Sequence, residues 1–580
     1  MPRLIAEAGF KIEAGNIFFI SHPNPSPTIR NWIAEGQIVS TTKRNCNLSQ
    51  EIRGEISLGS KFKVECHIET TTGYKIEFDY NSTSFDRMRK ALNKFSLNND
   101  DSCMSNQIRN LILRGGGGGD SSNVNINANF DALKIRPEDL TAPNLPSVNS
   151  SQANAIKTAI QRSLTLIQGP PGTGKTVTSA SIVYHLSQRG KVLVVASSNV
   201  AVDHLTDKIN QTGLRVVRLM AKSRENLESP NSHLNLHIQT RNKCENVDKA
   251  KKGYFKLLRR AERTILEGAQ VICCTCIGAG DRRLSTFRFS SVLIDEATQA
   301  TEPETLIALV RGARQVIMVG DHKQLGPVIV DVKCTKANFG RSMFERLIEA
   351  GTQSVCLTVQ YRMHPAIAQF PSNKFYNGSL KNGVTIEERT KTCFESDFIW
   401  PNPQVPMFFL TCSGSEELAS SGTSYLNRYE ASVIETIVTK LLKDSVLPSQ
   451  IGIITPYQGQ RTFITQIMTR NGSMDKKLYE EIEVASVDEF QGREKDYIIL
   501  SCVRSNNHSI IGFVSDPRRM NVALTRARFG LIILGNPKVL ATNKLWRNLI
   551  GRFDKLKVLL EMERNGNGNG NINNLKSFSL

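Results

Sequence analysis

A glycine-rich loop at residues 169–176 reads G-P-P-G-T-G-K-T. An apolar run, 164–167, comes before it, and a segment that can form a helix, 177–186, follows it. In a strand–loop–helix context the loop amides point at phosphate oxygens, and the helix start adds a partial positive charge. Lys175 then reaches the β- and γ-phosphates, and the Thr176 hydroxyl is a ligand for Mg²⁺. We therefore predict a nucleoside triphosphate site that takes ATP and Mg²⁺.

Two adjacent carboxylates, Asp295 and Glu296, follow the apolar run 291–294. Asp295 at the tip of a strand can hold Mg²⁺ through its water shell, and Glu296 can orient the water that attacks the γ-phosphate. The alternative is a pair of solvated acids at a strand end. The alternating strand and helix pattern around them favours the hydrolytic role. Gln324 follows another apolar run, 315–319, and its amide can contact both the γ-phosphate and the attacking water.

Two arginines, Arg362 and Arg526, stand in a later part of the chain that has no glycine loop of its own. Phosphoryl transfer needs cations on the γ-phosphate in the transition state, and the planar guanidinium suits that task. The alternative is a pair of surface arginines in salt bridges. If both reach across a cleft, ATP binding and hydrolysis would close and open it, which would couple the chemistry to motion.

The composition indicates a globular chain with a polyanionic partner. The chain has 580 residues, 40% of them hydrophobic and 22% charged, and a net charge of +19. Such an excess most often means nucleic acid, although a basic surface can also serve only solubility. No run of 18 apolar residues and no signal-peptide pattern is present, so we expect a soluble cytoplasmic protein without a membrane partner, in the simplest case a monomer.

The 12 cysteines are scattered and show no zinc-ligand spacing, so no structural metal is predicted. Cys273, Cys274 and Cys276 lie in an apolar run and are interpreted as reduced, buried thiols.

Periodicity and composition divide the chain into regions. The segments 61–69 and 74–80 alternate polar and apolar residues as half-buried antiparallel strands do, which makes a small β-barrel plausible. Strands and helices alternate later, as in parallel α/β sheets. The predicted regions are a β-barrel accessory domain at 1–96, a connecting segment with a flexible Gly/Asn-rich loop at 97–150, an α/β domain with the glycine loop at 151–351, a second α/β domain at 352–560, and a disordered tail at 561–580.

A basic helical insertion is predicted at 224–267, inside the first α/β domain. Its apolar residues keep one helical face, and cations crowd the others. Unbalanced cations repel one another, so a nucleic-acid clamp is favoured over a merely solvated surface. The cations are Lys249, Lys251, Lys252, Lys256, Arg259, Arg260 and Arg263.

As an ordered set, the motifs resemble those of superfamily 1 helicases. The residues within these motifs are similar to those of the up-frameshift branch, the ATP-dependent RNA helicases of nonsense-mediated mRNA decay. The resemblance covers nearly the whole chain from about residue 61 to 550. It rests on Gln152 and on the segments 169–176, 196–203, 295–296, 320–325, 360–365, 454–457, 486–494 and 521–528.

The resemblance implies an α/β fold with two RecA-like parallel-sheet domains, the first carrying a β-barrel insertion and a helical insertion. It implies that Gln152 reads the adenine edge, that Tyr361 stacks on the base and that Glu494 contacts the ribose. The loop residues Gly172, Thr173 and Gly174, with Lys175 and Thr176, would hold the phosphates. The resemblance keeps the roles given above for Lys175, Thr176, Asp295, Glu296, Gln324, Arg362 and Arg526.

The same resemblance implies a path for single-stranded RNA across both domains and movement from 5′ to 3′. It also implies mRNA-decay and translation-termination factors as partners. Family members carry an N-terminal Cys/His-rich zinc domain, whose spacing is not found here, so we expect either a shortened form or a truncated gene model. The expected RNA contacts are Ser197, Asn199, Val200, Lys222, Arg224, Thr275, Pro456 and Tyr457.

Two other readings remain open at this point. A related superfamily 1 helicase could act on DNA or on RNA–DNA hybrids, because tracking of phosphates is similar on both. A clamp that binds ATP without turnover is the third reading, and the intact set of Lys175, Asp295, Glu296, Gln324 and Arg526 speaks against it.

Overall fold

The computed structural model describes most of the chain. The described residues are 17–21, 33–46, 49–58, 75–79, 82–97, 103–115, 137–225, 231–244, 253–394, 400–420, 422–564 and 570–577. The predicted strand at 61–69, the glycine run beyond Gly115 and two parts of the basic insertion, 226–230 and 245–252, lie outside these residues. Contacts between Cα atoms divide the chain into two compact units. Unit 1 comprises Met1–Arg109, Leu186–Val292 and Pro303–Arg314; unit 2 comprises Asn110–His185, Leu293–Glu302 and Gln315–Leu580.

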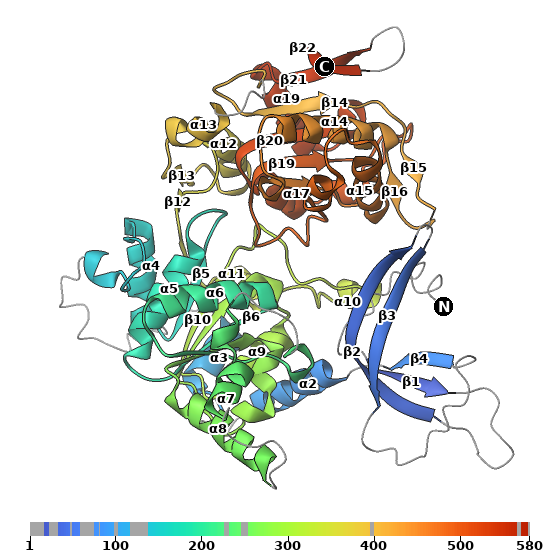
Figure 1. Ribbon diagram of the computed structural model, residues 1–580. Coiled ribbons are helices and arrows are strands. Elements are labelled where there is room, and N and C mark those ends of the chain that lie inside the picture. Colours follow the sequence, from blue (N-terminus) through green and yellow to red (C-terminus); the bar gives the residue numbers. More distant parts are fainter. Residues whose placement is uncertain are drawn as a thin grey trace, which may run out of the picture. The chain divides into compact units, whose positions relative to one another are not determined.

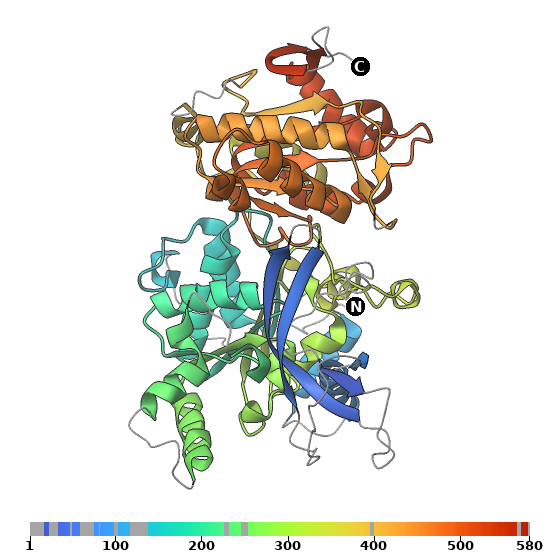
Figure 2. The same ribbon diagram turned by 45° about the vertical axis from the view of Figure 1, so that its right-hand side comes forward.

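The N-terminal part of unit 1 contains a four-stranded antiparallel sheet with strand order β3-β2-β1-β4. Figure 2 shows β2 and β3 as a long paired ribbon. The described strands make an open sheet, so closure into a barrel stays a prediction. The strands are β1 (Ile17–Ser21), β2 (Ile33–Cys46), β3 (Ser49–Leu58) and β4 (Lys75–Asp79).

The first parallel sheet has the strand order β11-β5-β10-β9-β6-β8-β7. In unit 2, β5 pairs in parallel with β10 and β11; in unit 1, β8 pairs in parallel with β6 and β7. The structure confirms the strands that the apolar runs predicted, which are β5, β6, β8, β9 and β10. Most of their residues are fully buried, as expected where helices cover both faces. The strands are β5 (Leu164–Gln168), β6 (Val192–Ala196), β7 (Val216–Arg218), β8 (Val271–Thr275), β9 (Ser291–Asp295), β10 (Gln315–Gly320) and β11 (Ser354–Cys356).

The second sheet lies within unit 2 and has the order β18-β17-β19-β20-β14-β21-β22. Its first six strands pair in parallel, and only β22 runs antiparallel to its neighbour. Helices α12 (Pro365–Phe375), α14 (Arg428–Lys443) and α19 (Lys544–Lys555) contact this sheet (Figure 1). The strands are β14 (Met407–Thr411), β17 (Ile451–Ile454), β18 (Glu483–Ala485), β19 (Lys495–Ser501), β20 (Ala527–Gly535), β21 (Leu559–Arg564) and β22 (Gly570–Ser577).

Two boundaries differ from the sequence-based expectation. Strand β11 belongs to the first sheet although it lies beyond residue 351. The segment 561–580, expected as a tail without structure, contains β22, which pairs with β21 from Leu560↔Ser577 to Arg564↔Gly570. The prediction from composition was wrong for residues 570–577. A strand at the edge of a sheet pairs through backbone hydrogen bonds, which a polar sequence can form without burying a core.

The basic insertion is helical in its described part. Helices α7 (Leu236–Lys243) and α8 (Tyr254–Gly268) pack against each other in unit 1. The predicted thiols are buried, with Cys273 and Cys274 on β8 and Cys276 just after it. No helix among the described residues has the length and apolar character needed to cross a membrane.

Candidate nucleotide site

The glycine loop joins β5 to helix α5 (Lys175–Ser187) in the predicted strand–loop–helix order. Gly172 and Gly174 have φ angles of +74° and +77°, a conformation that side chains disfavour. A Cβ at Gly172 would stand 2.6 Å from the Arg362 Cβ, and one at Gly174 would stand 2.6 Å from the Gln152 Nε2. The backbone conformation therefore favours glycine at both positions, and at Gly172 the space around it excludes a side chain as well.

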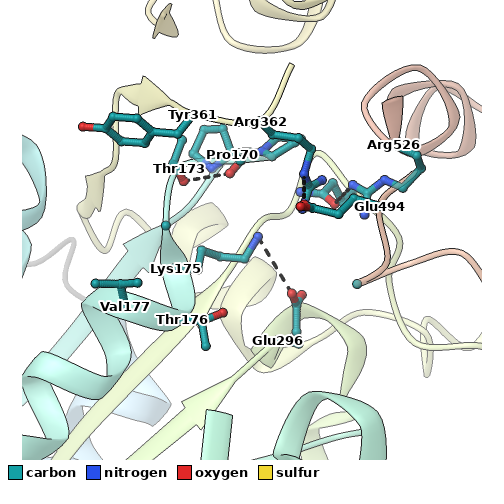
Figure 3. Close-up of a pocket in the computed structure, with 15 residues that line it drawn as sticks. Pro170, Thr173, Lys175, Thr176, Val177, Glu296, Tyr361, Arg362, Glu494 and Arg526 are labelled. Carbon is teal, nitrogen blue, oxygen red and sulfur yellow. Dashed lines mark hydrogen bonds and ion pairs between the residues drawn. The ribbon is translucent and has the colours of Figure 1, made fainter. Parts of the chain in front are cut away.

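A cavity of about 310 Å³ opens over this loop, entirely within unit 2 (Figure 3). This volume lies at the lower end of the range for small-molecule sites. The cavity brings together most of the predicted nucleotide residues although they lie far apart in sequence. These are Gly172, Thr173, Gly174, Lys175, Thr176, Glu296, Gln324, Tyr361, Arg362, Glu494 and Arg526.

The Lys175 ammonium points toward Glu296 (Figure 3). Its Nζ lies 3.8 Å from the Glu296 Oε1 and donates to the Gly169 carbonyl at 3.0 Å. Glu296 has φ +47°, in the left-handed region, and its other oxygen accepts from the Gln299 Nε2 at 2.9 Å. Backbone strain of this kind persists where the surrounding structure enforces it, and it is common at functional sites.

Asp295 lies at the end of β9, 5% exposed, and its Oδ1 has no hydrogen-bond partner among the described residues. Burial, followed by the neighbouring charge of Glu296, raises the pKa of Asp295 to about 7. A buried carboxylate oxygen without a partner is a suitable acceptor for a hydrated cation. The oxygen donors of Asp295 and Thr176 thus fit the expected Mg²⁺.

Arg526 is 2% exposed, and the acceptors of its hydrogen bonds are neutral oxygens. It donates to the Val522 carbonyl at 3.0 Å, to the Arg493 carbonyl at 3.3 Å and to the Gln324 Oε1 at 3.2 Å. Burial, followed by the repulsion of Arg362, lowers the pKa of Arg526 to about 9. No carboxylate lies within 4 Å of it in the described part of the chain. A desolvated cation with no carboxylate at ion-pair distance is suited to receive a phosphate.

Arg362 pairs with Glu494 through its Nε, and its Nη1 donates to the Thr525 carbonyl at 3.1 Å. Burial acts to raise the pKa of Glu494, but the charge and hydrogen bond of Arg362, with Arg528 and Arg526, leave that pKa lowered. Glu494 therefore stays ionised. Figure 3 shows this pair on the wall of the cavity that faces Lys175.

The residues assigned to the base are connected by Asn149, which the sequence analysis missed. Asn149 is the N-cap of α4 (Ser150–Gln161), and its Nδ2 donates to the Tyr361 hydroxyl at 2.9 Å. Gln152 closes the capping box and donates to the Thr173 carbonyl at 3.0 Å. Tyr361 is 40% exposed and lines the cavity; Gln152, 4% exposed, lies behind the loop.

The predicted RNA contacts of unit 1 lie at the carboxyl ends of parallel strands. Ser197 and Asn199 follow β6, with Val200 43% exposed in the first turn of α6 (Asn199–Gln211). The Asn199 Oδ1 accepts from Arg218 at 2.9 Å, and the buried Ser197 Oγ has no partner among the described residues. Thr275 ends β8, and the 3-10 turn Lys222–Arg224 follows β7.

The predicted RNA contacts of unit 2, Pro456 and Tyr457, follow β17. Tyr457 is only 4% exposed, and its ring packs edge-on against Tyr425 and Phe513. Its hydroxyl accepts from Arg504 at 3.3 Å. The Tyr457 side chain therefore supports this loop from within, whereas Pro456 is half-buried and Phe513 is 62% exposed.

Comparison with known proteins agrees with this architecture. Two family models, both described as AAA domain, match residues 147–254 with 236–331 and residues 339–538. The parallel sheets, the glycine loop and these matches define a P-loop protein with two AAA domains. Among solved structures, the arterivirus nonstructural protein 10 helicase aligns at 14% identity over 68% of this chain and 63% of that chain. Its TM-score is 0.34, which is too low to support an argument.

The curated relatives are far more similar. The chain is 50% identical over 569 residues to the Arabidopsis thaliana "Regulator of nonsense transcripts 1 homolog", covering 94% of this chain and 43% of the relative. It is 53% identical over 508 residues to the Saccharomyces cerevisiae "ATP-dependent helicase NAM7", covering 85% of this chain and 51% of the relative. Over most of its length, the chain is thus similar to part of the regulators of nonsense transcripts 1. It spans about half the length of the curated relatives it matches.

Proposed function

We propose that this chain is an ATP-dependent helicase and translocase that moves along single-stranded RNA in nonsense-mediated mRNA decay. ATP hydrolysis in the cavity of unit 2 would drive the movement. The names of the relatives, which include regulators of nonsense transcripts and ATP-dependent helicases, support the proposal. The net charge of +19 suits a polyanionic substrate.

The observation that carries the proposal is the buried Arg526, held at Gln324 in the cavity that also contains Lys175 and Glu296. The loop amides and Lys175 would bind the phosphates, and Glu296 would accept a proton from the attacking water. Arg526 and Arg362 would stabilise the charge that develops on the γ-phosphate. Bound Mg²⁺, held through Thr176 and Asp295, would supply charge neutralisation at the β- and γ-phosphate oxygens.

The choice of RNA as substrate, the 5′-to-3′ direction and the decay pathway are parts of this proposal that rest on the family resemblance. The same proposal includes a cytoplasmic location, a monomeric state, and mRNA-decay and translation-termination factors as partners. The contacts expected for nucleic acid track phosphate and sugar, so DNA or an RNA–DNA hybrid is the alternative substrate.

The test measures ATP hydrolysis with and without poly(U), followed by unwinding of matched RNA and DNA duplexes with a 5′ or a 3′ single-stranded tail. We expect hydrolysis that poly(U) stimulates, and unwinding of RNA duplexes with a 5′ tail. Unwinding of DNA alone would assign the alternative substrate. Unwinding only from a 3′ tail would contradict the proposed 5′-to-3′ direction. ATP binding without turnover would contradict the proposal that the protein is an enzyme.

A further inference from the structure

The hydroxyl of Tyr376 connects two parts of the nucleotide site that the reaction needs together. Tyr376 follows the last turn of α12 and is 5% exposed. Its hydroxyl donates to the Asp321 Oδ2 at 2.7 Å and accepts from the Asn521 Nδ2 at 2.8 Å. Asp321 follows β10, and Asn521 lies on helix α17 (Pro517–Leu524). One phenol oxygen therefore links three segments of unit 2.

The Asp321 side of this link orients Gln324. The carboxylate of Asp321, 1% exposed, accepts from the Gln324 Nε2 at 2.8 Å through Oδ2, the same oxygen that Tyr376 holds. Its Oδ1 accepts from the Lys323 amide at 3.1 Å. Because an ionised carboxylate only accepts, the amide nitrogen of Gln324 must face it. The Gln324 oxygen is left for the Arg526 Nη2, at 3.2 Å, and for a water in the cavity.

The Asn521 side of the link reaches the arginine. Asn521 is fully buried and donates to the Lys323 carbonyl at 2.9 Å as well as to Tyr376. The backbone carbonyl of Asn521 accepts from the Thr525 Oγ1 at 2.7 Å, and Arg526 directly follows Thr525 in the chain. Tyr376 thus lies between the loop that carries Gln324 and the helix end that carries Arg526.

We propose that Tyr376 is a positioning residue for ATP hydrolysis, whose hydroxyl fixes the Asp321 carboxylate and thereby aims the Gln324 amide at the γ-phosphate and its attacking water. The proposal rests on the proposed function of this site. Tyr376 itself does not line the cavity, so it acts through its two hydrogen bonds. Burial, with the neighbouring Asp321, raises the pKa of the Tyr376 hydroxyl well above its usual value, so the phenol remains a donor.

The test removes only the hydroxyl. Tyr376→Phe removes both hydrogen bonds of the hydroxyl, and we expect kcat for ATP hydrolysis to fall about tenfold, which corresponds to about 1.4 kcal/mol. The KM for ATP should change less than about twofold, because the loop amides and Lys175 are untouched. ADP affinity should stay the same, whereas affinity for ADP with aluminium fluoride, which mimics the transferred phosphate, should fall by a factor similar to that of kcat.

A matched control is Tyr479→Phe. Tyr479 is 1% exposed, also lies in unit 2, and its hydroxyl is 2.6 Å from the Thr439 Oγ1, apart from every cavity residue. This variant also loses two hydrogen bonds of a buried hydroxyl, so it should lower the melting temperature to a similar extent with kcat unchanged. A general loss of packing would lower kcat in both variants.

A double variant tests the route. If Tyr376 acts through Gln324, then adding Tyr376→Phe to Gln324→Ala should cause no further loss of kcat. Unchanged kcat in Tyr376→Phe, equal loss of ADP and ADP–aluminium fluoride affinity, or independent losses in the double variant would each overturn the inference. If the wild-type protein itself lacks nucleic-acid-stimulated turnover, the proposed function fails instead.

Discussion

The Lys175 ammonium lies 3.8 Å from the Glu296 carboxylate while it donates to the Gly169 carbonyl at 3.0 Å. Both side chains are about 15% exposed, so the attraction between them is little screened by water. The two groups therefore neutralise each other at the place where a γ-phosphate is expected. Phosphate oxygens that attract Lys175 would free the carboxylate of Glu296 for the attacking water.

Glu296→Gln should separate binding from hydrolysis. The amide keeps the shape of the side chain but cannot accept the proton of the water, so we expect kcat to fall at least about 100-fold. ATP should still bind, as measured by fluorescence of a labelled nucleotide. Lys175→Ala, in contrast, should abolish both the binding and the hydrolysis of ATP. Glu349→Gln, on an exposed carboxylate paired with Arg341, is the control and should behave as wild type. Full turnover in Glu296→Gln would contradict the assigned role.

Gly172→Ala should block the nucleotide site. At φ +74° an alanine is strained by about 1–2 kcal/mol, and its Cβ would stand 2.6 Å from the Arg362 Cβ. We expect the KM for ATP to rise at least about tenfold. Gly551→Ala, in the middle of α19 with nothing within 4 Å, should instead raise the melting temperature slightly and leave KM unchanged. An unchanged KM in Gly172→Ala would show that the loop adapts.

Glu430→Gln should change the pH dependence of stability. Glu430 is fully buried on α14 and accepts from the Ser501 hydroxyl at 2.6 Å and from the Val503 amide. Burial raises its pKa to about 7 from 4.5, although these hydrogen bonds act to lower it. A raised folded-state pKa stabilises the protein below the unfolded pKa, and this contribution is lost as the pH rises through about 7.

The wild type should therefore lose about 3 kcal/mol relative to Glu430→Gln between pH 4.5 and pH 8. Chemical denaturation at several pH values measures this difference, in which the other titrating groups cancel. Glu435→Gln, at a half-buried position of the same helix, is the control and should follow the wild-type profile. Parallel profiles for wild type and Glu430→Gln would mean that Glu430 is ionised throughout this range.

Reversing the exposed charges of α8 should weaken RNA binding. Arg263 pairs with Glu267 at 2.8 Å, whereas Arg259 and Arg260 are exposed and have no carboxylate within 4 Å in the described part of unit 1. If both contact phosphates, then Arg259→Glu with Arg260→Glu should reduce the slope of log affinity against log salt by about 1.4. Fluorescence anisotropy with a labelled oligouridine measures this slope.

The control for α8 is Lys538→Glu with Lys544→Glu, which changes the net charge equally at exposed positions. We expect this control to leave the slope closer to that of the wild type. Equal slopes in the two double variants would identify α8 as solvated surface.

The sequence by itself determined the local elements of both sheets and much of the nucleotide site. Strands β5, β9 and β10 and helix α5 were predictable because buried parallel strands are short apolar runs, and the loop that follows β5 has a strict glycine spacing. The role of Lys175 follows from that spacing alone.

Only the tertiary structure decided how the distant residues combine. It seats Arg526 against Gln324, 202 residues away, and places the Tyr376 hydroxyl between Asp321 and Asn521. It also buries Tyr457, whose position in its motif suggested a nucleic-acid contact. Periodicity indicates whether a residue faces a core. The residue type of a tyrosine or an aspartate does not indicate whether its polar atom binds water or a buried partner. That choice depends on which segments the fold brings together.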